Sequence, residues 1–141
     1  MVQAPVGGAS TPGLAAAVSN AGGLGTLSLT WRSPETARAL IRETRRLTDR
    51  PFAVNLVLEW DPTERLAIAL AEGVRVVSFF WGDPAPFVPG VHDAGALVIH
   101  AVASAEEAQR AVAAGVDLVV AQGWEAGGHV WGEVATLALV P

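Results

Sequence analysis

The sequence predicts an α/β fold in which parallel strands alternate with helices. Six short apolar runs are separated by segments of helical period, and the runs cover residues 2–4, 24–29, 52–58, 74–80, 96–101 and 116–121. They are almost continuously apolar, which is typical of parallel strands buried on both faces. Successive starts of the last five runs lie 28, 22, 22 and 20 residues apart, so each unit has room for a strand, a helix and two loops.

Start and stop signals mark most of the helices between these runs. A helix is expected to begin at a capping residue and often ends at a glycine. The beginnings are Thr11-Pro12, Ser33-Pro34, and the capping patterns at residues 61–64 and 104–107, and the stops are Gly22-Gly23, Gly73 and Gly115. Three prolines between residues 83 and 95 predict only a short or broken helix there.

Two architectures fit this order of elements: an open doubly wound sheet and part of an eight-stranded βα barrel. A complete barrel needs about 250 residues, so the length of 141 residues alone favours the open sheet. The two ends of the chain are also informative. The first predicted strand is very short, and residues 133–141 look like a helix that leads into another strand. Both features are expected of a piece of a larger fold.

The composition excludes several classes of function. Lys and Arg number 9 against 14 Asp and Glu, a net charge of −5 without a basic run, so we expect no nucleic-acid partner. Cysteine is absent and the three histidines lack metal-ligand spacing, so we expect no metal. No apolar stretch reaches the roughly 18 residues of a membrane span, and the N-terminus lacks a secretory pattern. We therefore expect a cytoplasmic protein with no membrane partner.

The most distinctive segment is the glycine-rich stretch 122–132, which directly follows the sixth apolar run. Four of its eleven residues are glycine, which lets the backbone approach a flat ligand closely. Sites in α/β folds form at the carboxyl ends of strands, and His129 in this stretch is suited to carrying a proton near neutral pH. A flexible loop with a solvated histidine is the alternative interpretation.

Other features allow both a functional and a structural interpretation. Asn55 interrupts the apolar run 52–58, so a buried amide there must meet a ligand or be satisfied by the backbone. The segments 7–12 and 20–25 either approach a cofactor or serve as a capped loop and a tight turn. His100 lies at the end of the fifth run and is expected at the same edge of the sheet as the glycine-rich stretch.

Together these motifs closely resemble those of the nitronate monooxygenase family, formerly called 2-nitropropane dioxygenases. The matching residues are Gln3-Ala4-Pro5, Ser10-Thr11-Pro12, residues 15–25, Pro51-Phe52, Val54-Asn55-Leu56, Ala121-Gln122-Gly123, residues 125–129 and Gly132. The resemblance implies an FMN-dependent TIM-barrel enzyme, and hence a partial (βα)8 barrel of about six parallel strands with intervening helices. Residues 1–141 are then expected to be a single N-terminal segment of that barrel, without its C-terminal strands.

The resemblance also implies roles for single residues. The positions that match flavin contacts of the family are Ala4, Pro5, Asn55, Gln122, Gly127 and Gly128, and His129 matches the active-site histidine beside the substrate. A flat flavin ring needs glycine-backed clearance and a few polar contacts, which agrees with these residue types. Two features depart from the family. The last two strands, whose loops hold the FMN phosphate in such barrels, are missing, and Ala101 stands where some relatives carry lysine.

The implied reaction is the FMN-dependent oxidation of an alkyl nitronate or nitroalkane by O2, which yields a carbonyl compound and nitrite. Two alternatives stay open. One is an FMN-dependent enoyl-acyl-carrier-protein reductase, which shares the Gly-Gly-His motif and also uses NAD(P)H. The other is a non-catalytic, truncated barrel fragment. The isolated chain is expected to associate with itself through open barrel edges, because its outer strands lack the charges that normally protect an edge.

Overall fold

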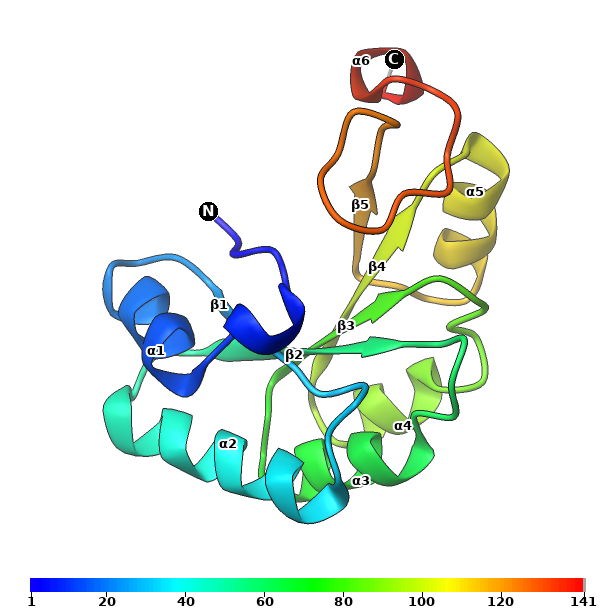
Figure 1. Ribbon diagram of the computed structural model, residues 1–141. Coiled ribbons are helices and arrows are strands. Elements are labelled where there is room, and N and C mark those ends of the chain that lie inside the picture. Colours follow the sequence, from blue (N-terminus) through cyan, green and yellow to red (C-terminus); the bar gives the residue numbers. More distant parts are fainter. Residues whose placement is uncertain (141) are drawn as a thin grey trace.

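The computed structural model describes residues 1–140, which contain one curved sheet of five parallel strands (Figure 1). The strands are β1 (Gly25–Ser28), β2 (Phe52–Val57), β3 (Val76–Phe80), β4 (Leu97–Val102) and β5 (Leu118–Ala121). Each strand pairs with the next one along the chain, in the order β1-β2-β3-β4-β5. A doubly wound sheet would change direction at a switch point. The partial barrel is therefore confirmed, and the open doubly wound sheet is wrong.

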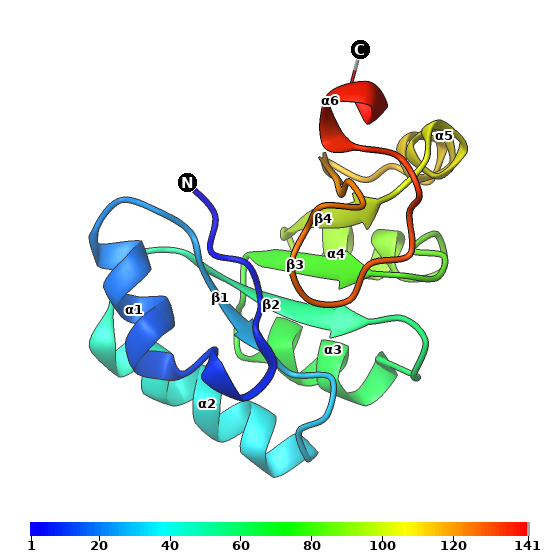
Figure 2. The ribbon, with the colours of Figure 1, turned by 45° about the horizontal axis from the view of Figure 1, so that its top comes forward.

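Most of the helices follow the sheet along its outer, convex side, and the last one lies beyond the end of the last strand (Figures 1 and 2). The helices are α1 (Pro12–Asn20), α2 (Pro34–Leu47), α3 (Thr63–Ala71), α4 (Val88–Asp93), α5 (Ala105–Ala113) and α6 (Thr136–Leu139), with a 3-10 helix, η1, at Gly7–Ala9. The short α4 confirms the interrupted helix expected in the proline-rich segment. Within residues 1–140, no helix is both long and apolar enough to cross a bilayer. The expected helix at 133–141 is reduced to α6, and Pro141 lies outside the described residues.

The first predicted strand is the point at which the sheet differs from the sequence expectation. Val2 forms a single parallel bridge with Leu24, not a strand, so five strands and one bridge replace the six. The ladder stops because Pro5 has no N–H to donate. The side chain of Gln3 then continues the pairing: its Nε2 donates to Thr26 O at 3.2 Å, and its Oε1 accepts from Thr26 N at 3.3 Å.

Side-chain caps begin three of the helices as the sequence predicts. The hydroxyl oxygens of Thr11, Ser33 and Ser104 accept hydrogen bonds from backbone N–H groups three residues further on, at 3.2, 3.2 and 3.1 Å. The capping box predicted from Asp61 is wrong. Because α3 begins only at Thr63, the Asp61 carboxylate accepts from Thr63 N at 2.9 Å, which makes a local turn before the helix.

The two faces of the sheet have different characters. The outward face packs on the helices and provides the largest fully buried side chains, among them Leu27, Leu56, Val77, Phe79 and Val98. The inward face carries smaller and polar residues. In register across three adjacent strands, Ser28 lies beside Asn55, which lies beside Ser78. The sheet thus presents a polar strip to the space enclosed by its curve.

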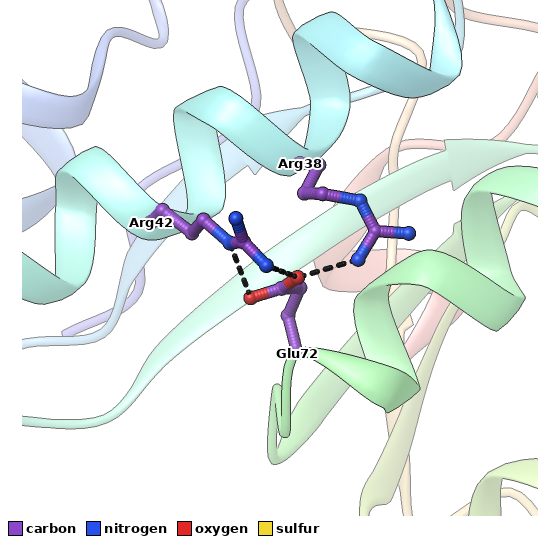
Figure 3. Close-up of polar contacts among 3 residues, drawn as sticks. All are labelled: Arg38, Arg42 and Glu72. Carbon is purple, nitrogen blue, oxygen red and sulfur yellow. Dashed lines mark hydrogen bonds and ion pairs between the residues drawn. The ribbon is translucent and has the colours of Figure 1, made fainter.

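A charged cluster joins two helices on the outer surface, away from that strip (Figure 3). The Glu72 carboxylate, just after α3, accepts from Arg38 Nη1 at 2.6 Å, and from Arg42 Nη2 and Nε at 2.9 and 3.0 Å. The hydrogen bond from Arg42 is the main reason that the pKa of Glu72 lies below its usual value. Both arginines belong to α2, so the cluster ties α2 to the end of α3.

The glycine-rich segment 20–25 is a helix stop and a site of close backbone contact. Gly22 has a φ of +85°, a conformation that suits glycine. A Cβ on Gly25 would lie 1.9 Å from the backbone oxygen of Ala15, so only glycine lets α1 lie this close to β1. Ser19 Oγ accepts from Gly25 N at 3.1 Å and donates to Pro51 O at 2.8 Å. These contacts support the structural interpretation of the segment.

Candidate active site

A cavity of about 800 Å3 lies against the inner face of the sheet. We call it the main cavity. Its walls are the polar strip of the sheet, the N-terminal segment 2–7 and the loop that follows β5. The lining includes every residue to which the family resemblance gives a site role: Ala4, Pro5, Asn55, Gln122, Gly127, Gly128 and His129. The structure thus brings together residues that are up to 125 positions apart in the chain, from Ala4 to His129.

Asn55 lies in the floor of the main cavity. Its side chain is 4% exposed, and its Nδ2 donates to Ser78 O at 3.3 Å and to Ser78 Oγ at 3.4 Å. The neighbouring strand therefore satisfies the amide nitrogen and fixes its orientation. No donor among residues 1–140 pairs with Oδ1, so the acceptor side of the amide is free to meet a ligand.

Gln122 connects β5 to the histidine of the loop. Its backbone N–H donates to Val102 O at 2.8 Å, which extends the pairing of β4 and β5 by one residue. Its Nε2 donates to the backbone oxygen of His129 at 3.2 Å. Its Oε1 is buried and, among the described residues, has no hydrogen-bond partner. A buried acceptor without a partner is unfavourable, so this atom is suited to a ligand that donates a hydrogen bond.

The loop after β5 is held at both of its ends. The Glu125 carboxylate accepts from Thr136 N at 2.9 and 3.2 Å, and the Thr136 hydroxyl accepts from Gly123 N at 3.2 Å. Hydrogen bonds from the backbone of Glu125 itself and from Thr136 lower the pKa of this carboxyl. These contacts argue against the flexible-loop interpretation, although the His129 side chain itself is exposed.

The two glycines before His129 leave open space beside the cavity. A Cβ placed on Gly127 or Gly128 would meet no atom within 4 Å. Gly128 has a φ of +82°, which strongly favours glycine at this position. The backbone of the loop is therefore accessible to a flat ligand, as the sequence predicts from the glycine content.

Trp81 is a residue of the site that sequence reasoning missed. It follows β3 directly and has a φ of +59°, the only positive value for a non-glycine residue within the described chain. This backbone conformation costs about 1–3 kcal/mol and persists only when the surroundings enforce it. The ring of Trp81 lies edge-on to His129, with centroids 5.5 Å apart, and to Trp131, at 6.2 Å. The bulky apolar run 79–81 ending at Gly82 is the sequence signal that was available.

A second cavity, of about 470 Å3, lies beside the main one. We call it the side pocket. It is lined by Glu59, Trp81, Gly82, His100, Ala101, Glu107 and Trp131. His100 therefore lies at the expected carboxyl edge of the sheet, but it lines the side pocket and not the main cavity. Its side chain is 4% exposed and its Nδ1 is unpartnered in the described structure. Burial lowers the pKa of His100, and the nearby Glu107 charge partly opposes this shift.

Comparisons with known proteins bear on the family and fold of the chain. The model of the nitronate monooxygenase family matches residues 1–64 and 60–141. A protein named nitronate monooxygenase from Pseudomonas aeruginosa is 40% identical over 170 aligned positions, which cover 92% of this chain and 48% of the relative. The chain spans about half the length of the curated relatives it matches.

Two solved structures share the fold closely. The structure of FabK from Thermotoga maritima has a TM-score of 0.94 and 40% identity, covering 98% of this chain and 44% of that one. A nitroalkane oxidase from Streptomyces ansochromogenes has a TM-score of 0.91 and 32% identity, covering 98% of this chain and 53% of that one. The family match over the whole chain, supported by these likenesses, shows that the chain belongs to the nitronate monooxygenase family.

Proposed function

We propose that this chain contributes the flavin-facing half of an FMN-dependent enzyme that oxidises alkyl nitronates with O2 to a carbonyl compound and nitrite. The observation that carries the proposal is the convergence on one cavity of Asn55, Gln122 and His129 with the backbone of Ala4 and Pro5. The substrate is a small molecule, either the nitronate anion or the neutral nitroalkane.

The residues of the main cavity fit an FMN ring. The volume of about 800 Å3 falls within the range of sites that hold cofactors and drug-sized ligands. An isoalloxazine ring offers one N–H donor between two carbonyl acceptors. The unpartnered Oε1 of Gln122 fits the donor, and the open backbone at Gly127 and Gly128 fits the flat face. Asn55 would supply a further amide contact from the floor.

The chain's own residues account for binding and for proton transfer. FMN, when bound, would supply an acceptor for two electrons from the substrate, and O2 would restore its oxidised form. His129 is held through its backbone oxygen by Gln122, and its ring is positioned against Trp81. From there the imidazole would remove the α-proton of a neutral nitroalkane, or donate a hydrogen bond to the oxygen of a nitronate anion. The apolar surroundings, including Phe80 and Ile99, would exclude water from the reacting atoms.

A second candidate is an FMN-dependent enoyl-acyl-carrier-protein reductase. The likeness to FabK from Thermotoga maritima, at 40% identity, supports it, because that identity equals the value for the Pseudomonas aeruginosa nitronate monooxygenase. The two candidates differ in the reductant: a nitronate in the first and NAD(P)H in the second.

The deciding experiment is anaerobic mixing of the FMN-loaded protein with each reductant in turn. The proposed function predicts that ethylnitronate rapidly bleaches the visible flavin absorbance and that NADH does so far more slowly. The opposite order would favour the reductase. Loaded protein that neither compound reduces would favour the non-catalytic fragment.

We further propose that the edge of β5 is where additional βα units of a complete barrel pack. The side chains of Leu118, Val119 and Val120 are 54%, 38% and 48% exposed, whereas every residue of β2 is buried. An apolar edge strand without protecting charges readily pairs with another strand. The same surface is the origin of the self-association expected of the isolated chain.

A further inference from the structure

Two cavities share one side-chain wall at the end of β3. Trp81 and Ala101 line both the main cavity and the side pocket. Ala101 carries only a methyl group, so the Trp81 indole is the bulky part of the partition. His129, the residue placed beside the reacting atoms, lies edge-on to that indole, with centroids 5.5 Å apart.

The position of the indole is enforced from several directions. Its ring lies 5.1 Å from Phe80 and 6.2 Å from Trp131, centroid to centroid. The Trp131 Nε1 in turn donates to the Glu107 carboxylate at 3.0 and 3.2 Å. The left-handed backbone at Trp81, with a φ of +59°, is maintained against its intrinsic cost. The partition is thus a built feature and not a mobile surface side chain.

The side pocket differs in character from the main cavity. The carboxylates of Glu59 and Glu107 lie in its lining, with His100. Their negative charge disfavours an anionic head group, so a nitronate would keep its head in the main cavity near His129. The part of a substrate that meets the partition is therefore its carbon tail.

We propose that Trp81 determines the length of substrate that the main cavity accepts, by closing it off from the side pocket. This assignment rests on the proposed function for the identity of the ligand, but the partition itself is a property of the two cavities. Trp81→Gly removes the wall and places glycine at a positive φ, which glycine adopts without strain. A longer carbon chain then extends into the side pocket.

The test is binding of straight-chain 1-nitroalkanes from nitroethane to 1-nitrooctane, measured by calorimetry without oxygen and with FMN present. Affinity rises about fourfold for each methylene that is buried. In the wild type this rise in affinity stops where the alkyl chain of the ligand meets Trp81. In Trp81→Gly it continues for about two further methylenes, so the affinity ratio of 1-nitrooctane to 1-nitrobutane increases about fifteenfold. Trp81→Phe, which keeps one aromatic ring, gives a smaller increase.

Trp124→Gly is the matched control, because Trp124 lines neither cavity and is 61% exposed. In this control, the affinity ratio of 1-nitrooctane to 1-nitrobutane should equal that of the wild type. An unchanged ratio in the folded Trp81 variants would overturn the assignment, as would a lack of nitroalkane binding to every variant. If Trp81→Gly does not fold, an unchanged ratio in Trp81→Phe overturns it. If the ratio increases but ethylnitronate fails to reduce the flavin of the wild type, the proposed function fails and the role of Trp81 in limiting length stands.

Discussion

Glu107 accepts two hydrogen bonds from the indole Nε1 of Trp131, at 3.0 Å through Oε1 and 3.2 Å through Oε2. This contact joins the first turn of α5 to the loop that carries His129, across 24 residues of sequence. The same carboxylate accepts from Ala103 N at 2.7 Å, so the start of the helix and the loop depend on one side chain. Rigid placement of a proton-transferring group depends on supporting contacts of this kind.

Trp131→Phe should therefore loosen the loop without removing its aromatic contacts. A hydrogen bond to a charged group contributes about 1.5 kcal/mol, so amide hydrogen exchange in residues 123–132 should become about tenfold faster. Trp124→Phe is the control, since Trp124 lies on the same loop and is 61% exposed. Equal exchange rates in the two variants would show that the bond to Glu107 does not hold the loop.

Gly25→Ala should destabilise the fold strongly. The added Cβ would lie 1.9 Å from Ala15 O, so α1 and β1 must move apart, at a cost of about 3 kcal/mol. Gly13→Ala is the matched control in α1. Its Cβ meets nothing within 4 Å, and alanine favours the helix by about 0.5–1 kcal/mol. Chemical unfolding should order the proteins Gly13→Ala, wild type, Gly25→Ala, from most to least stable. A Gly25→Ala protein as stable as wild type would contradict the close contact.

His100 should make the fold less stable in mild acid. Burial lowers its folded pKa below the ordinary 6.5, so beneath that pH the unfolded chain binds a proton that the folded chain resists. The free energy of unfolding should be constant above about pH 7 and fall below it, by at most about 1.4 kcal/mol per pH unit. His100→Leu should remove this decrease, whereas His92→Gln should keep it. The measurement is urea unfolding from pH 8 to 5. A decrease in the free energy of unfolding in His100→Leu equal to that in the wild type would contradict the assignment of this effect to His100.

The exposed edge of β5 should cause the isolated chain to associate. Val119→Lys places a charge on that edge, on the side chain that does not line the main cavity, and should shift the elution volume toward that of a monomer. Leu14→Lys, on the distant α1, should leave the association unchanged. Light scattering after size-exclusion chromatography distinguishes these cases. A monodisperse monomer of the unmodified chain would show that the edge is not a pairing surface.

Much of the fold could be predicted from the sequence, because local signals and tertiary structure agree. Continuous apolar runs predicted the five strands, and capping residues such as Ser33 and Ser104 predicted where helices begin. The run at residues 2–4 failed as a strand because Pro5 ends the ladder and the Gln3 side chain replaces it. Pro5 is visible in the sequence, but the two hydrogen bonds between the Gln3 side chain and the Thr26 backbone are tertiary contacts that no periodicity can reveal.

The site could be predicted only in part. The expected residues do line one cavity, because parallel strands place their carboxyl ends together. The direction of His100 could not be predicted, since a strand apolar on both faces shows no alternation to tell inward from outward positions. The role of Trp81 could not be predicted from the sequence either. Its ring contacts His129 and Trp131, which come from a loop about fifty residues later, so no local signal shows that it belongs to the site.

The central claim, that the main cavity is the flavin site, is tested most directly by titrating FMN into the 15N-labelled protein and following its amide resonances. We predict saturable shifts that are largest for the backbone of Ala4, Gln122, Gly127 and Gly128 and for the side-chain amide of Asn55. Weak binding does not obscure this pattern, since shifts are mapped at each FMN concentration. Shifts confined to other surfaces, or none as FMN increases, would contradict the claim.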